Sequence, residues 1–197
     1  MEPCPRQGPT PELRSRLLDV AIELLAIDGP ASVTTRQVAS LAATSATSIY
    51  ELFGDKAGLI RAMCFEGFRR LAAVLDELPA PTGTRQDLVD AVDTYRRFAA
   101  ANPRLFEVMY TKPFDEYSPS AEERSLGDVT RDFLVNRVEG CVANAVLRGD
   151  PTDIAHALLA VVIGLSTQET AGWLGRTRAA RDRRWSSATT ALLDGFS

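Results

Sequence analysis

The sequence predicts an all-α protein, and three observations lead to that prediction. Apolar residues recur at spacings of three and four through most of the chain, as they do on one face of an α-helix. No segment alternates apolar and polar residues in the manner of a half-buried strand. Proline and glycine separate the apolar segments, where helices begin and end. With 197 residues, 45% of them hydrophobic, the chain can bury a sizeable core.

The N-terminal third is expected to contain three short helices. Residues 1–9 hold three of the eleven prolines and are expected to form a flexible arm. Thr10-Pro11 is typical of a helix start, since a hydroxyl cap precedes proline at the first helical position. We expect this helix to end at Asp28-Gly29-Pro30. A second helix should start at Thr34, which forms a capping-box pattern with Gln37.

A third short helix and a long fourth helix should follow. Either Thr44 or Ser45 can cap the third helix. Gly54-Asp55 then ends one helix and caps the next, which should run from Lys56 to about residue 78. The clearest linker is 79–83, because it contains two prolines and a glycine.

The remaining chain again shows helical periodicity. One apolar stripe ends at Asn102-Pro103, and a short segment follows it. A long stripe is expected to end at Gly149, and Asp150-Pro151 should start the next helix. The last stripe begins at Trp185. Segment 157–165 is apolar on almost every side, which suits a helix that is buried on several faces.

The charge balance does not by itself indicate a nucleic-acid-binding protein. The net charge is −4, and residues 1–56 contain five basic and seven acidic side chains. Any DNA contact would therefore depend on a locally arranged face rather than on a general positive field.

The string from Thr34 to Ile60 is the most specific feature of the chain. It combines Thr-Thr-Arg, a helix break, Ile-Tyr-x-x-Phe and Asp-Lys-x-x-Leu-Ile. In this combination it resembles the DNA-binding segment of the TetR family, and the similarity extends over about residues 13–65. The resemblance implies a homodimer that binds a double-stranded DNA operator through a helix-turn-helix. It also implies a repressor that a small-molecule effector releases.

The resemblance implies four segments and a set of DNA-binding residues. The segments are the arm 1–9, a helix-turn-helix domain 10–56, a connecting helix 57–78 and a ligand-binding and dimerisation domain 79–197. In a helix-turn-helix the second helix enters the major groove, and hydroxyl side chains there can bond phosphates or base edges. Tyr50 alternatively packs on its neighbours. The DNA-binding residues are Thr35, Arg36, Ser45, Ala46, Thr47, Ser48, Tyr50 and Lys56.

Four positions depart from the usual family pattern. Ala43 occupies a turn position that is mostly glycine, so a left-handed backbone there would be slightly strained. Thr44 replaces a buried valine, and Ala46 replaces a frequent lysine or glutamine. Glu51 either accepts a hydrogen bond from a cytosine amino group or faces solvent. With so few cations, we expect modest non-specific affinity and a shallow salt dependence.

The C-terminal half carries weaker signals. Segments 95–110 and 164–173 resemble one group of TetR-family ligand domains, and the last two helices are expected to pair with their copies in a dimer. His156 either bonds a ligand or is satisfied at the interface, and the arginines of 176–184 form either a solvated turn or an anion site. The residues that either line an apolar pocket or belong to the plain core are Phe98, Phe106, Met109, Tyr110, Phe114, Phe133 and Trp173.

The composition argues against an enzyme. The chain has one histidine, and Cys4, Cys64 and Cys141 lie far apart without metal or redox spacing. Cys64 and Cys141 are expected to be small apolar core residues, because free cysteine is usually buried. No catalytic residue, metal or cofactor is expected. The longest apolar run, 157–163, is too short to cross a membrane, and the N-terminus lacks a signal-peptide core, so we expect a cytoplasmic protein. A helical protein-binding adaptor without DNA-binding activity is the alternative.

Overall fold

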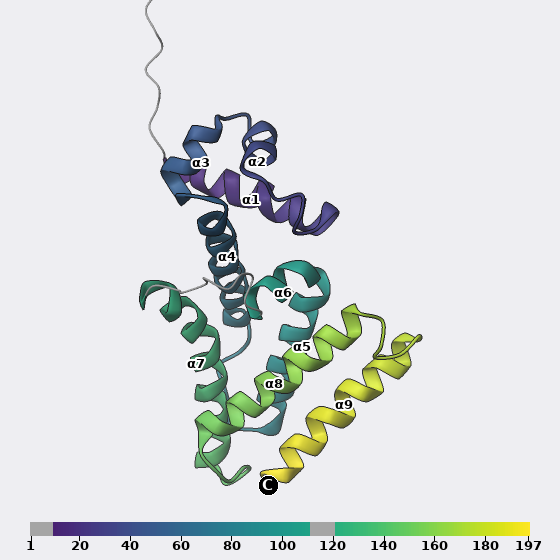
Figure 1. Ribbon diagram of the computed structural model, residues 1–197. Coiled ribbons are helices and arrows are strands. Elements are labelled where there is room, and N and C mark those ends of the chain that lie inside the picture. The colour runs from purple at the N-terminus through teal and green to yellow at the C-terminus, as the bar shows by residue number, and fades with distance from the viewer. Residues whose placement is uncertain (1–9, 111–120) are drawn as a thin grey trace, which may run out of the picture.

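The computed structural model describes residues 10–110 and 121–197, and these parts form nine α-helices and no strands (Figure 1). The predicted all-α class is therefore confirmed. The predictions for the arm 1–9, Cys4 and Phe114 lie outside the described residues. The helices are α1 (Pro11–Asp28), α2 (Thr35–Leu41), α3 (Ala46–Phe53), α4 (Lys56–Asp76), α5 (Arg85–Ala101), α6 (Pro103–Tyr110), α7 (Ala121–Ala143), α8 (Pro151–Thr170) and α9 (Arg178–Gly195).

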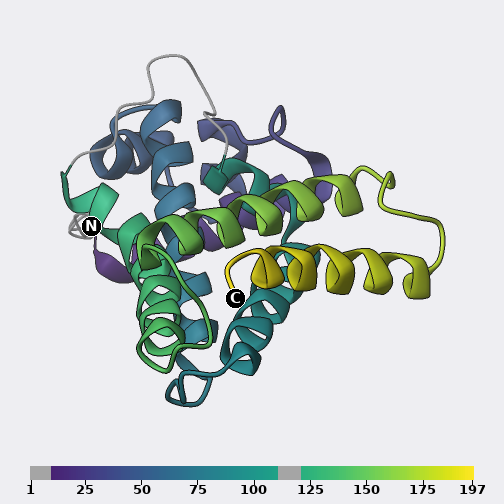
Figure 2. The ribbon, with the colours of Figure 1, turned by 90° about the horizontal axis from the view of Figure 1, so that it is seen from below.

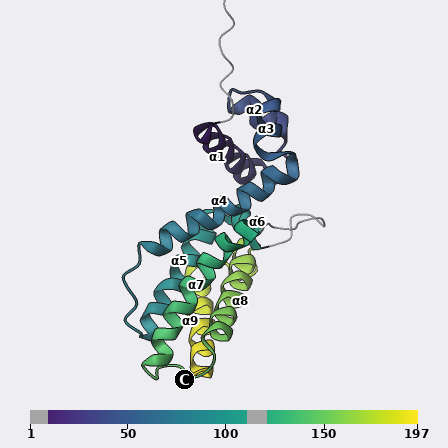
Figure 3. The ribbon, with the colours of Figure 1, turned by 90° about the vertical axis from the view of Figure 1, so that its left-hand side faces the viewer.

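The first three helices form a small domain at one end of the molecule (Figures 1 and 3). The predicted caps are present: Leu13 N donates to Thr10 Oγ1 at 3.2 Å, and Gly29 ends α1 with a φ of +85°. Only half of the predicted capping box forms. Gln37 N donates to Thr34 Oγ1 at 3.2 Å, whereas Thr34 N donates to a backbone oxygen at residue 32.

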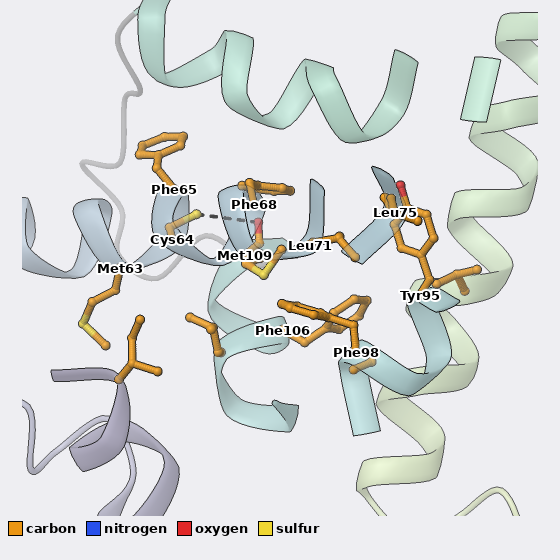
Figure 4. Packing of buried hydrophobic residues seen from close by; sticks show 14 of the residues in the cluster. Met63, Cys64, Phe65, Phe68, Leu71, Leu75, Tyr95, Phe98, Phe106 and Met109 are labelled. Atoms are coloured by element: carbon orange, nitrogen blue, oxygen red, sulfur yellow. Dashed lines mark hydrogen bonds between the residues drawn. The ribbon is translucent and has the colours of Figure 1, made fainter. Parts of the chain in front are cut away.

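Helix α4 joins the small domain to the larger one (Figure 3). It contacts α1 and α3 on one side and α5, α6 and α7 on the other, so one continuous apolar core passes through both domains. The contact with α6 is close, because a Cβ added to Gly67 would lie 2.6 Å from the Sδ atom of Met109. Cys64 also faces α6, with its Sγ atom 3.9 Å from the Met109 carbonyl oxygen (Figure 4).

In the larger domain, α5, α6 and α7 pack against α4, and α8 and α9 pack against α5 and against each other. Helix α6 is short and lies beneath the small domain, while α8 and α9 run side by side along one face (Figures 1 and 2). Phe98 of α5 and Phe106 of α6 lie beside the α4 residues Phe68 and Leu71 in the core (Figure 4). Tyr95 is fully buried and donates from its hydroxyl to the Thr130 carbonyl oxygen of α7 at 2.7 Å.

One predicted helix end is wrong. Helix α4 ends at Asp76, within two residues of the expected end, whereas α7 ends at Ala143 rather than at Gly149. Ala145 takes a left-handed backbone with a φ of +56°, and Val146 N donates to Cys141 O at 2.9 Å, which closes the helix. The apolar pattern continues past the break because Leu147 is still buried.

Candidate nucleic-acid interface and ligand domain

Helix α3 has the two-sided character expected of a recognition helix. Ile49 and Phe53 are buried against the small domain. Thr47, Tyr50 and Glu51 are exposed on the other side. Tyr50 is 54% exposed, so it does not serve as a core residue. The exposed side of α3 is therefore accessible to a binding partner, and Glu51 faces solvent.

Hydroxyl groups organise the start of α3. Ser45 is the N-cap, since its Oγ atom accepts a hydrogen bond from Ser48 N at 3.2 Å. The Thr44 hydroxyl donates to Ser48 Oγ at 3.2 Å, and the Ser45 and Ser48 oxygens lie 3.1 Å apart. Thr44, which replaces an apolar residue of the family pattern, thus supports the cap. Sequence analysis missed this role because hydroxyl pairing depends on side-chain direction.

The turn between α2 and α3 has the predicted strain. Ala43 has a φ of +51°, in the left-handed region that favours glycine. Thr44 N donates to Ala39 O at 2.9 Å across this turn, so the hydrogen bonding holds the backbone there. The turn therefore takes a left-handed backbone with alanine in the place of the usual glycine.

Two exposed cations flank α3. Arg36 lies in the first turn of α2 and Lys56 is the first residue of α4, and neither forms an ion pair within the described residues. Asp55 caps α4 by accepting from Gly58 N at 2.7 Å. The exposed surface around α3 therefore carries both acidic and basic side chains rather than being strongly basic, as the composition indicates.

A third cation beside α3 was missed. The guanidinium carbon of Arg14 lies 5.5 Å from the ring centroid of Phe53, so this exposed α1 residue stands at the end of the recognition helix. No sequence spacing relates residue 14 to residue 53, and only the tertiary structure brings the two side chains together. All eight predicted DNA-binding residues are exposed or half-buried. They lie on α2, on α3 and its N-cap, or at the start of α4.

Contacts from α6 and α4 hold the small domain on the larger one. Arg104 of α6 donates from Nη1 to Leu25 O at 3.0 Å, near the C-terminus of α1. Arg70 of α4 pairs with Asp19 of α1 and with Glu66 one turn away at 2.8 Å. A movement of α6 or α4 would therefore act directly on α1.

Five of the candidate ligand residues belong to the core or pack against it. Phe98, Phe106 and Met109 are buried, and the Tyr110 ring packs on Phe106 with their centroids 4.7 Å apart. The Tyr110 hydroxyl is buried without a hydrogen-bond partner, and burial raises the pKa of this phenol well above its usual value. Phe133 is half-buried beneath a guanidinium group.

Trp173 does not join these residues. It lies in the α8–α9 connection and is 80% exposed, so the prediction that it lines a shared pocket disagrees with the structure. The backbone leaves α8 after Thr170, and Trp173 N donates to Gln168 O at 2.9 Å, which turns the chain outward. The similarity of segment 164–173 to ligand domains did not predict this turn, so Trp173 was expected to face the core.

Two of the arginines of 176–184 form hydrogen bonds to α8 or to the α8–α9 connection. Arg181 donates to Glu169 and to the Gly175 carbonyl oxygen, and Arg184 donates to the Leu174 carbonyl oxygen. These bonds fasten the α8–α9 connection. His156 is exposed on α8.

Glu169 is the centre of an ion-pair network between α5, α8 and α9. Arg96 donates to both of its carboxylate oxygens at 3.0 and 3.1 Å, Arg181 donates at 3.1 Å, and the Trp185 indole N–H donates at 2.6 Å. Burial opposes ionisation, but the hydrogen bonds from Arg96 and Trp185 and the two positive charges outweigh it. They hold the pKa of Glu169 below its ordinary 4.5.

Comparison with known families decides the class. Residues 17–63 match the bacterial regulatory proteins of the tetR family, and residues 88–192 match the tetracyclin repressor-like C-terminal domain. The chain belongs to the TetR family. It is therefore a DNA-binding regulator with a helix-turn-helix and a helical ligand-binding domain.

Individual relatives agree with this assignment. The HTH-type transcriptional repressor KstR of Mycolicibacterium smegmatis is 27% identical over 172 residues, which cover 87% of this chain and 81% of that protein. A structure of a protein of unknown function from Rhodococcus sp. RHA1 is 26% identical, with a TM-score of 0.78, and the match covers 98% of this chain and 99% of the other. A tetR-family regulatory protein from Rhodococcus RHA1 is 20% identical, covers 93% and 98% of the two chains and shares the fold with a TM-score of 0.68.

Within residues 10–110 and 121–197, no group of three or more histidine, cysteine, aspartate or glutamate side chains is arranged to hold a metal ion. Over the same residues, no helix combines the length and apolar character needed to cross a membrane.

Proposed function

We propose that this chain is a cytoplasmic, ligand-responsive repressor that binds a palindromic DNA operator as a homodimer. The observation that carries the proposal is the exposed surface of α3 with its flanking cations. Thr47 and Tyr50 project from the helix that a helix-turn-helix inserts into the major groove. Arg36 and Lys56 stand on either side of it without ion-pair partners among the described residues, so phosphates are their natural counter-ions.

The dimer is proposed to form through α8 and α9. Within one chain, Leu158 and Val162 of α8 are buried, but Ala160 and Gly164 are exposed on the same helix. A Cβ added to Gly164 would meet no atom within 4 Å, so this face is open. An apolar helix face that remains uncovered in the monomer favours association with a second copy, and a two-fold dimer matches a palindromic operator.

The ligand response is proposed to depend on the aromatic core of the larger domain. Phe98, Phe106, Met109, Tyr110 and Phe133 supply apolar surface, and the unpartnered hydroxyl of Tyr110 supplies a polar contact. A small apolar molecule that binds there would release the operator only if it favours a conformer in which α4 has moved and the two recognition helices are no longer one DNA turn apart.

The test is a selection of bound genomic fragments with the purified full chain, followed by analytical ultracentrifugation. We expect enrichment of one inverted-repeat sequence whose half-sites lie on the same face of the duplex, and a protein that sediments as a dimer. An empty selection from a folded dimer would contradict the DNA-binding part and favour the adaptor. Enrichment by a monomer would contradict only the dimer.

A further inference from the structure

A small cleft opens between α6 and the C-terminal half of α8. Its volume is about 170 Å³. The α6 wall consists of two apolar residues and one acidic residue, the α8 wall carries hydroxyl groups, and no lysine or arginine lines the cleft. The lining residues are Pro103, Phe106, Glu107, Ser166, Thr167, Thr170 and Ala171.

Ser166 is the unusual residue of this cleft. It is 4% exposed, and its Oγ atom is buried without a hydrogen-bond partner. Two other helical hydroxyls bond the carbonyl four residues earlier: Thr167 of the same helix donates to Ile163 O at 2.9 Å, and Thr94 of α5 donates to Asp90 O at 2.8 Å. A buried hydroxyl without a partner destabilises a fold, so it calls for a functional explanation.

We propose that this cleft is a subsite for an uncharged, ring-sized group that carries a hydroxyl. The Ser166 Oγ atom has almost no accessible surface in this conformation, so a rotation about χ1 turns the hydroxyl into the cleft, where it donates its hydrogen to the oxygen of the ligand. Thr167 already uses its own hydrogen on Ile163 O but keeps acceptor lone pairs, so it can receive the hydrogen of the ligand. A group that accepts one bond and donates another is a hydroxyl. The absence of a basic lining side chain disfavours an anion.

The size of the cleft supports a ring. A buried apolar cavity of about 150 Å³ is known to bind benzene, and the cleft is similar in volume. Phe106 and Pro103 provide the apolar wall against which such a ring would pack. The Phe106 ring also contacts Tyr110, so this wall is continuous with the aromatic core.

The position of the cleft gives its occupation a consequence for the small domain. Phe106 lines the cleft, and Arg104 on the same two-turn helix bonds Leu25 O near the end of α1. A ligand between α6 and α8 therefore acts on the helix that holds α1. This regulatory role rests on the proposed function, whereas the binding itself does not.

The test compares benzyl alcohol with toluene, which differ only in the hydroxyl. Each would be titrated into the full chain without DNA, and the methyl NMR signals of Thr167, Thr170 and Ala171 would be followed. We expect saturable shifts of these signals with both probes. Benzyl alcohol should bind about three- to tenfold more tightly, which is the range that one net hydrogen bond supplies.

Matched serine variants assign the hydroxyl. Ser166→Ala should bring the two affinities within about twofold, with a melting temperature equal to or above that of the wild type because the variant lacks an unpaired buried hydroxyl. Ser187→Ala, an exposed serine of α9, should keep the wild-type ratio. The proposal is overturned if the three methyl signals do not shift saturably, or if Ser166→Ala keeps the preference for the alcohol. Since no DNA is present, a failure of operator binding would leave the result unaffected.

Discussion

The contact between Arg104 and α1 leads to a prediction for Arg104→Ala. The guanidinium donates to Leu25 O at 3.0 Å, and the same oxygen accepts from Gly29 N at 3.1 Å. The carbonyl belongs to the last turn of α1, where the helix dipole favours a positive charge. Removal of the side chain deletes the one hydrogen bond that joins α6 to α1 among those observed in the described residues.

The size of the effect follows from this environment. A hydrogen bond from a charged group contributes about 1.5–3 kcal/mol, and the value here should lie near the lower end because Arg104 is half-buried and Leu25 O keeps its second donor. We therefore expect a loss of about 1.5–2 kcal/mol. For a chain of this length that corresponds to a melting temperature lower by about 3–8 °C.

Calorimetry at fixed protein concentration measures the change, and hydrogen exchange locates it. The fixed concentration matters because the melting temperature of an oligomer depends on it. Exchange should accelerate at residues 22–29 of α1. Arg97→Ala is the control, because Arg97 is exposed and donates within α5 to Thr94 Oγ1, and it should shift the melting temperature by less than about 1 °C. Wild-type exchange in α1 together with an unchanged melting temperature would refute the assigned role of Arg104.

Three further predictions concern other parts of the chain. Because the pKa of Glu169 is lowered in the fold, its ion pairs stabilise the protein above pH 4.5 and are lost as the pH falls through that lowered pKa. Trp185 fluorescence should therefore report a loosened α8–α9 contact only in acid. A change in this fluorescence above pH 6 would contradict the assignment. Ala43→Gly should stabilise the chain by about 0.5–1 kcal/mol in urea titrations, since relief of the left-handed strain exceeds the added chain entropy; destabilisation would show that the turn is unstrained. Gly58→Ala should lower the free energy of unfolding by about 2–3 kcal/mol and displace α3, because the added Cβ would lie 1.8 Å from the backbone oxygen of Phe53. Gly195→Ala, whose Cβ would meet no atom within 4 Å, should leave the stability unchanged. Equal stability of the two variants would contradict this packing.

Local signals in the sequence predicted most helix boundaries. The cap at Thr10, the stop at Gly29 and the start of α8 at Asp150 all form as expected, because each depends on a residue and its neighbours within one turn. The predicted end of α7 was wrong because no proline or glycine follows Ala143 before Gly149, and apolar residues continue beyond the break. Periodicity reports which side chains face a core and not whether the backbone between them is helical.

The candidate site likewise contains features that local sequence signals predicted and contacts that they could not predict. The string around Tyr50 predicted a surface helix, and its burial pattern agrees. Contacts between distant segments, such as Arg14 with Phe53 or Arg104 with Leu25, could not be predicted, because they depend on how α1 packs on α3 and α6. The exposure of Trp173 was missed for the same reason, since an aromatic residue next to an apolar helix is usually buried.

The most direct test of the central claim is a fluorescence-anisotropy titration of the selected operator at two salt concentrations. The wild type, the Arg36→Ala/Tyr50→Ala double variant and a scrambled duplex would be compared. We expect saturable binding that both the double variant and the scrambled duplex lose. With Arg36 and Lys56 as phosphate contacts in each half of a dimer, log affinity should fall with log salt at a slope of about −3 to −4. Equal binding of both duplexes, or a double variant that binds like the wild type, would contradict sequence-specific recognition by α3.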